Sequence, residues 1–196
     1  ADSIGYFGKD DPLPDDIEKK FPKTGDHSIY TRCKNCAVDF IEHYYYEFDL
    51  PRFVFRLPTI YSYHPDTHYF VNGERKEKAY WYMIRQAIKG NLLQIWGDPE
   101  KKKEIFYVKD MAKAVLLAVD SSLPGGVYNV GRGVGVSLQD QIEGIAEVFS
   151  PDEKYCGVEY RPEKTNGRQF VHSIDKLRND LGFEPDYDYK SMLLDI

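Results

Sequence analysis

Tyr30 and Lys34 stand four positions apart in the segment Tyr30-Thr31-Arg32-Cys33-Lys34. In a helix this spacing places two side chains on one face, with Cβ atoms roughly 5–6 Å apart. A cation at that distance lowers the pKa of a tyrosine phenol from its usual value of about 10. A phenol tuned in this way can exchange a proton with an alcohol or sugar hydroxyl, which is general acid–base chemistry.

The same spacing occurs a second time, at Tyr160 and Lys164. Pro162 lies between these two residues, removes a backbone donor and interrupts any helix that continues from Tyr160. The chain has 16 tyrosines, so the pattern is expected by chance. We therefore interpret the second copy as coincidence, and the first copy needs support from other segments.

Several further segments accompany Tyr30 in a fixed order along the chain. They are residues 3–8, 52–61, 95–98, 104–114, 127–131 and 181–185. In this order and spacing they resemble the extended short-chain dehydrogenase/reductase family, the NAD-dependent nucleotide-sugar epimerases and dehydratases. The resemblance covers nearly the whole chain.

This resemblance implies an α/β fold: the C-terminal part of a Rossmann-like, doubly wound parallel sheet and a small α+β substrate-binding region. Residues 1–60 would form the C-terminal half of the NAD(P)-binding Rossmann domain. Residues 61–196 would be mainly substrate-binding, with interleaved segments that return to the Rossmann domain. The family's Gly-rich dinucleotide-binding segment does not precede Ser3, so we expect the N-terminal half of the fold to be missing from this chain.

The resemblance also assigns roles to particular residues. Tyr30 would be the catalytic base, and Lys34 would tune it and bind the nicotinamide ribose. Ser3 would hydrogen-bond the substrate oxygen, and the backbone at Pro58 would contact the nicotinamide. The implied cofactor is NAD or NADP, and the residues that distinguish the two lie in the absent half.

The match to individual reactions is looser. Family dehydratases carry Thr-Asp-Glu where this chain has Ser3-Ile4-Gly5, so the acid and base that expel water are absent. We therefore expect an epimerase or reductase that acts on a sugar-like, or nucleotide-linked, alcohol or carbonyl. Candidate substrate contacts are Thr59, in place of the family's Asn, Lys103, near the family's diphosphate-binding Arg, and Arg168. The loop with His64, His68, Tyr69 and Phe70 stands where the family sets specificity.

Two other motifs have simpler interpretations. Gly131-Arg132-Gly133-Val134-Gly135-Val136 lacks the last glycine of a dinucleotide-binding loop and is interpreted as a tight turn. Cys33 and Cys36 form a C-x-x-C pair, but no second pair of ligands accompanies them, so we predict no metal site and expect Cys33 to pack within its helix. Three cysteines in all argue for reduced thiols.

Composition limits the class of protein further. The 196 residues are 42% hydrophobic, which suffices for a real core. The net charge of −6 does not suggest a nucleic-acid or anionic-membrane partner. No apolar run reaches the roughly 20 residues that cross a bilayer, and no signal-peptide pattern is seen. A cytoplasmic location fits best.

Periodicity predicts alternating helices and strands. We expect helices at residues 28–50, 77–89, 109–121, 137–149, 174–181 and 189–196. We expect strands at residues 52–57, 92–96, 104–108, 126–130, 158–160 and 170–173. The first helix has an apolar stripe of Ala37, Phe40, Ile41 and Tyr44.

Two alternatives to an enzyme remain open. The chain could be a non-catalytic family member that binds a dinucleotide as a sensor or scaffold, although Ser3, Tyr30 and Lys34 argue against this. It could also be an inactive interaction fragment whose helix at residues 28–49 pairs subunits. Many family members form homodimers through that helix, so a homodimer is expected in either case.

Overall fold

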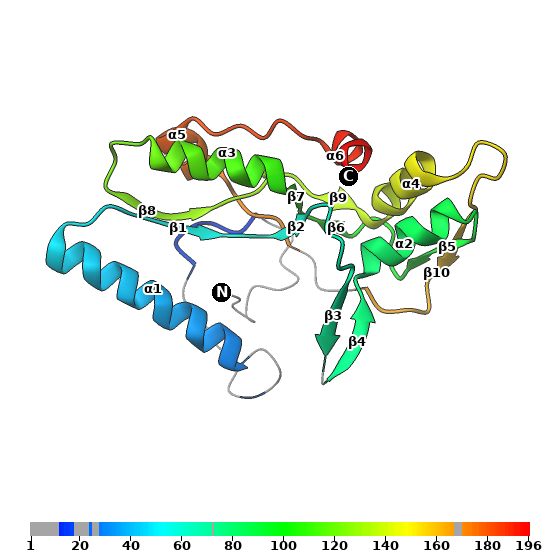
Figure 1. Cartoon of the computed structure of the whole chain (residues 1–196), viewed down its shortest axis with the longest axis horizontal. Helices are drawn as coiled ribbons and strands as arrows, with labels where there is room; N and C mark the ends of the chain where they lie inside the picture. Colours follow the sequence, from blue (N-terminus) through cyan, green and yellow to red (C-terminus); the bar gives the residue numbers. More distant parts are fainter. Residues whose placement is uncertain (1–11, 18–23, 25–27, 72, 167–169) are drawn as a thin grey trace. The chain divides into compact units, whose positions relative to one another are not determined.

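A computed structural model describes residues 12–17, 24, 28–71, 73–166 and 170–196 (Figure 1). The chain divides into two compact units with interleaved segments. The first contains residues 1–60, 104–135 and 168–186, and the second contains residues 61–103, 136–167 and 187–196. Ser3 and Arg168 lie outside the described residues.

Two parallel strands organise the first unit, β1 (Arg52–Arg56) and β8 (Gly125–Asn129). Phe53, Phe55 and Tyr128 project from one face of this pair into an apolar cluster with Phe106. The helices α3 (Val108–Val119) and α5 (Asp175–Leu181) cover that face (Figure 1). Burial of these rings and aliphatic side chains is what holds the unit together.

The helix α1 (Ser28–Phe48) lies on the opposite face of the same strands (Figure 1). Arg52 on β1 fixes it: the guanidinium binds both carboxylate oxygens of Glu42 at 2.9 and 3.2 Å and stacks 3.7 Å from the centre of the Tyr45 ring. A two-pronged ion pair of this kind specifies geometry as well as attraction. The C-terminal half of α1 is therefore anchored to β1.

The second unit contains a parallel pair, β5 (Leu93–Trp96) and β10 (Val158–Arg161), with α2 (Ala79–Ile88) and α4 (Leu138–Phe149) beside it. Ser137 caps α4 by accepting a hydrogen bond from the Asp140 N–H at 3.0 Å, as expected for a serine N-cap. The last helix, α6 (Tyr189–Asp195), packs on α4.

The remaining strands form three short pairs. β2 (Thr59–Tyr61) pairs with β7 (Ile105–Tyr107), and β6 (Lys102–Lys103) pairs with β9 (Val136–Ser137). β3 (His68–Val71) and β4 (Glu74–Glu77) form an antiparallel hairpin. No helix within the described ranges is long and apolar enough to cross a membrane.

Three local expectations from the sequence are wrong. The hairpin β3–β4 was not expected, and its second strand occupies the predicted start of the second helix, which begins at Ala79 instead. The strand expected at residues 170–173 is a single bridge between His172 and Leu13. Cys33 was expected to pack within its helix, but it is exposed, because Thr31 and Asn35 occupy the buried side of α1.

Candidate active site

Tyr30 and Lys34 lie one turn apart on α1, as their spacing predicts. The Nζ atom of Lys34 is 5.7 Å from the centre of the Tyr30 ring, within the range of a cation–π contact. Tyr30 is 54% exposed. The structure therefore places a phenol and an ammonium group side by side on the surface of α1.

The second copy of the spacing has a different geometry. Tyr160 lies on the strand β10, and Lys164 follows it in a turn. The Nζ atom of Lys164 lies 5.6 Å from the centre of the Trp96 ring, on another strand. This geometry is consistent with the interpretation of the second Tyr–Lys spacing as a coincidence.

The carboxyl end of β1 carries two other predicted residues. Pro58 stands two residues after the end of β1, and the exposed Thr59 opens β2. In parallel α/β sheets, ligands bind beyond the carboxyl ends of the strands. Both residues thus stand at the edge where such a ligand would lie.

Residues 12–17, which precede α1 in the chain, are anchored at this same edge. Asn129, at the end of β8, donates from its side-chain amide to the carbonyls of Leu13 at 2.8 Å and Ser173 at 3.2 Å. Arg56, at the end of β1, donates to the Asp15 carbonyl at 2.6 Å. Burial raises the pKa of the Asp15 carboxyl, which accepts a hydrogen bond from the Asn129 N–H.

Lys103 lies on β6 in the second unit and is half-buried. Burial lowers the pKa of its ammonium, because desolvation disfavours the charged form. The Lys103 ammonium has no hydrogen bond or ion pair to other described residues. A partly desolvated cation in this state is suited to an anionic ligand group.

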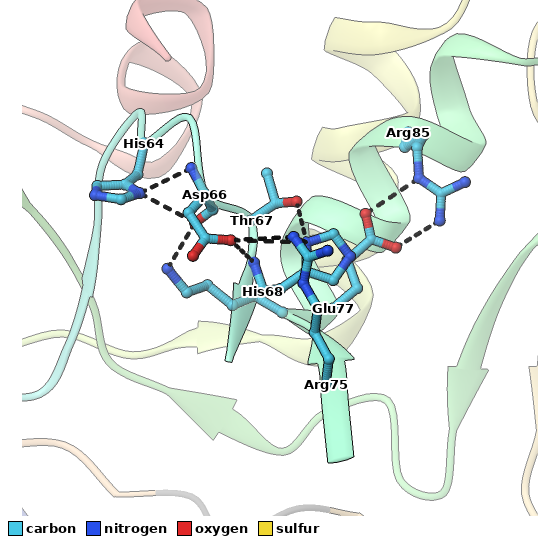
Figure 2. Close-up of polar contacts among 8 residues, drawn as sticks. His64, Asp66, Thr67, His68, Arg75, Glu77 and Arg85 are labelled. Atoms are coloured by element: carbon cyan, nitrogen blue, oxygen red, sulfur yellow. Dashed lines mark hydrogen bonds and ion pairs between the residues drawn. The ribbon is translucent and has the colours of Figure 1, made fainter. Parts of the chain in front are cut away.

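The hairpin β3–β4 contains the predicted specificity loop (Figure 2). The Nδ1 atom of His64 lies 3.0 Å from the backbone N–H of Asp66, and the Asp66 carboxylate accepts from the His68 N–H at 3.0 Å. That backbone hydrogen bond holds the pKa of Asp66 below its usual value. His64 and His68 thus take part in holding the loop, whereas Tyr69 and Phe70 are 45% and 70% exposed.

Glu77 closes the base of the same hairpin. It binds Arg85 on α2 through two hydrogen bonds of 3.1 and 2.5 Å, and the guanidinium lowers the pKa of the carboxyl (Figure 2). The hairpin is therefore tied to α2 as well as to its own loop, and its exposed rings project from a fixed base.

The Gly131–Gly135 loop follows β8, and two of its backbone donors are used within the protein. The N–H groups of Arg132 and Gly133 donate to the buried carboxylate of Glu104 at 2.9 and 2.8 Å. A dinucleotide loop needs such donors for a pyrophosphate, and here Glu104 already occupies them. The interpretation as a turn is consistent with this geometry.

The role of Glu104 was not predicted from the sequence, although the sequence contains one signal for it. A charged residue opens the apolar run Ile105-Phe106-Tyr107, and a charge at such a position needs partners if it is buried. The partners are distant in sequence, so the pattern alone could not identify them. Within the described parts of the chain, no group of three or more metal-binding side chains occurs.

Parallel strand pairs and helices on both faces of β1 and β8 define a Rossmann-like α/β fold. The model of the NAD dependent epimerase/dehydratase family matches residues 1–131. The chain belongs to this family.

Individual relatives agree with that assignment. The low-salt glycan biosynthesis protein Agl12 of Haloferax volcanii is 27% identical over 96% of this chain and 54% of its own length. The human dTDP-D-glucose 4,6-dehydratase is 22% identical over 94% of this chain and 52% of its own length. The chain thus spans about half the length of these curated relatives.

Solved structures show the same fold. The UDP-N-acetylglucosamine 4-epimerase from Bacillus cereus superposes with a TM-score of 0.71, at 19% identity, over 94% of this chain and 57% of its own. The UDP-glucuronic acid 4-epimerase from the same organism, solved in complex with NAD, superposes with a TM-score of 0.69 at 19% identity over 98% of this chain and 57% of its own.

Proposed function

We propose that this chain is part of an NAD(P)-dependent epimerase or reductase that acts on a sugar-like alcohol or carbonyl, with a nucleotide-linked sugar as the favoured form. The observation that carries the proposal is the accessible Tyr30 phenol with the Lys34 ammonium 5.7 Å from its ring. Family membership supports the cofactor. The chain's span of about half its relatives makes the activity a property of the full-length protein.

Residues of this chain suit the nicotinamide end of the cofactor. Lys34 offers a donor to a ribose hydroxyl next to the Tyr30 phenol, and Pro58 offers a backbone carbonyl at the carboxyl end of β1. The bound cofactor would accept or return a hydride. The loop after β8 does not offer the Arg132 and Gly133 N–H groups to the cofactor's pyrophosphate, because Glu104 accepts both.

Tyr30 would remove the proton of the substrate hydroxyl and return it after the hydride has moved. Lys34 would hold a cation and a hydrogen-bond donor beside the phenol while the proton moves. Ser3 would donate a hydrogen bond to the same substrate oxygen. Epimerisation and simple reduction need only these three groups, whereas dehydration needs an additional acid and base that Ile4 and Gly5 do not provide.

Lys103 and Arg168 remain the proposed contacts for an anionic part of the substrate, and Thr59 remains a proposed contact for its sugar. The half-buried, unpaired state of Lys103 supports its role. Tyr69 and Phe70 offer exposed aromatic faces at the specificity loop. A second copy of the chain, docked on α1, is the proposed macromolecular partner.

The replacement Tyr30→Phe in the full-length protein tests the proposed chemistry. We expect turnover of UDP- and dTDP-linked hexoses to fall by about 10²–10⁴-fold, because a positioned acid–base group contributes that much. Inversion at the sugar carbon is followed by NMR, and net reduction is followed by nicotinamide absorbance. NAD binding should persist, since the cofactor is held by more than this phenol.

Tyr160→Phe is the matched control, because it removes the phenol of the coincidental copy and should leave turnover unchanged. Full activity in Tyr30→Phe would contradict the proposal. Dinucleotide binding without turnover of any sugar nucleotide or small carbonyl would instead favour the sensor or scaffold alternative. Formation of a 4-keto-6-deoxy sugar from dTDP-glucose would contradict the exclusion of dehydration.

A further inference from the structure

Glu104 is a buried acid of the first unit with several hydrogen-bond partners. Its side chain is 0% exposed. One carboxylate oxygen accepts from the N–H groups of Arg132 at 2.9 Å and Gly133 at 2.8 Å. The other accepts from the His172 N–H at 2.9 Å and lies 2.7 Å from Nδ1 of the same residue. Four charge-assisted hydrogen bonds therefore join three distant segments.

The packing around the Glu104 carboxylate restricts the backbone of the loop that follows β8. A Cβ atom on Gly131 would lie 2.2 Å from a Glu104 oxygen, so only glycine fits there. Gly133 has a φ of +73°, which favours glycine as well. The two glycines and the carboxylate fix the backbone of Arg132, which stands between them.

Unlike the Glu104 carboxyl, the Arg132 side chain has no hydrogen-bond or ion-pair partner among the described residues. Its Nε atom is buried without a hydrogen-bond partner, and no ion pair to it occurs among the described residues. A buried guanidinium donor without an acceptor is unfavourable unless a ligand supplies one. Arg132 also follows the carboxyl end of β8, the side of a parallel strand pair on which ligands bind.

We propose that Arg132 binds a diphosphate group and that Glu104 is the residue that positions it. Guanidinium groups match phosphate oxygens with two parallel donors. The Glu104 carboxyl already accepts the hydrogen bonds of the Arg132 and Gly133 N–H groups, so these two donors do not compete for the ligand. The inference rests on the proposed function, which supplies two diphosphates: that of a nucleotide-linked sugar and that of the dinucleotide.

Calorimetric titration of the full-length protein with UDP, dTDP and NAD separates these sources. We expect Arg132→Gln to weaken binding of the nucleoside diphosphates about tenfold, a loss of about 1.4 kcal/mol. Arg132→Lys should recover part of the affinity, because it keeps the charge without the fork. Loss confined to NAD would support the diphosphate site and assign it to the dinucleotide.

Arg161 on β10 provides a control for charge, since its guanidinium pairs with Glu159 and Arg161→Gln should leave all three affinities unchanged. Unchanged binding of UDP, dTDP and NAD by Arg132→Gln would overturn the proposal. So would a full-length protein that binds none of the three. The Tyr30→Phe assay depends on turnover instead of diphosphate affinity, so each proposal can fail separately.

The role of Glu104 needs a variant that separates positioning from stability. Glu104→Gln should weaken diphosphate binding several-fold and lower the melting temperature. Asp110→Asn is the matched control, because Asp110 is equally buried and accepts the Asp186 N–H at 2.8 Å. It should lower the melting temperature without changing diphosphate affinity.

His172 gives a conservative rescue. His172→Ala should weaken diphosphate binding, whereas His172→Asn, whose amide nitrogen can replace Nδ1 as a donor to Glu104, should restore most of it. Melting-temperature losses in Glu104→Gln and His172→Ala with unchanged affinity would show that Glu104 has only a structural role.

Discussion

At the scale of single residues, the chain contains two kinds of polar group, one exposed and one buried. Tyr30 and Lys34 are exposed and lie close together on α1. Glu104 is buried and receives four hydrogen bonds, so it acts on ligands only through the residues that it holds. The spacing in the sequence revealed the first pair, and packing revealed the second group.

The replacement Gly131→Ala tests how tightly Glu104 is packed. We expect it to lower the free energy of unfolding by about 1–3 kcal/mol, the usual cost of overpacking, because the added methyl group would lie 2.2 Å from a carboxylate oxygen. Urea denaturation measures this loss.

Gly182→Ala serves as the comparison. Gly182 has a φ of +62° with open space around its Cβ position, so its cost is conformational and about 1–2 kcal/mol. The two variants thus separate steric crowding from backbone strain. Diphosphate affinity should fall only in Gly131→Ala, and equal affinity in both variants would contradict the steric link between Gly131 and Arg132.

At the scale of secondary-structure elements, α1 has two sides. Thr31 and Asn35 lie on its buried side, whereas Ile29, Phe40, Tyr44 and Phe48 are each more than half exposed. The helix has 21 residues and is therefore about 31 Å long, enough for an extended helix–helix contact. An exposed apolar stripe of this kind is typical of an association surface.

The double replacement Phe40→Glu and Tyr44→Glu tests α1 as the surface that pairs two copies. We expect sedimentation equilibrium to show a dimer for the unaltered full-length protein and a monomer for the variant, because two buried carboxylates would face an apolar partner. Phe70→Glu, on the hairpin, replaces an equally exposed ring and should leave the dimer intact. A monomeric unaltered protein, or a dimeric double variant, would contradict this surface.

At the scale of the whole molecule, two compact units are each assembled from three separate stretches of chain. The C-terminal helix α6 belongs to the second unit and completes it. Tyr189 donates from its phenol to the Gln141 carbonyl on α4 at 2.8 Å, and Leu193 is 1% exposed against the same helix. Stability of the second unit therefore depends on the last residues of the chain.

Leu193→Ala should destabilise the second unit by about 2–5 kcal/mol, because it leaves a cavity beside α4. Hydrogen exchange should then accelerate in α4, while the β8 amides of the first unit keep their protection. Leu194→Ala, at an adjacent side chain that is 69% exposed, should change neither. Faster exchange throughout β8 would show that the two units unfold together.

Much of the fold could be predicted from the sequence, because local signals are strong where periodicity is regular. α4 ends at Phe149 as predicted, and α3 and α5 lie within a few residues of their predicted limits. The hairpin β3–β4 was missed, because Glu74-Arg75-Lys76-Glu77 is charged throughout and has no alternation of apolar residues. Its strands form through cross-strand pairing, which sequence periodicity does not register.

The sequence by itself identified the family and the helix that carries Tyr30 and Lys34. It also distinguished this pair from the second Tyr–Lys spacing at Tyr160, which Pro162 interrupts. Helical spacing is a local property, so four positions suffice to place two side chains together. The network of Glu104, Arg132 and His172 was decided only by the tertiary structure. These residues are far apart in the chain, and only folding brings the buried carboxyl of Glu104 to the N–H groups that donate hydrogen bonds to it.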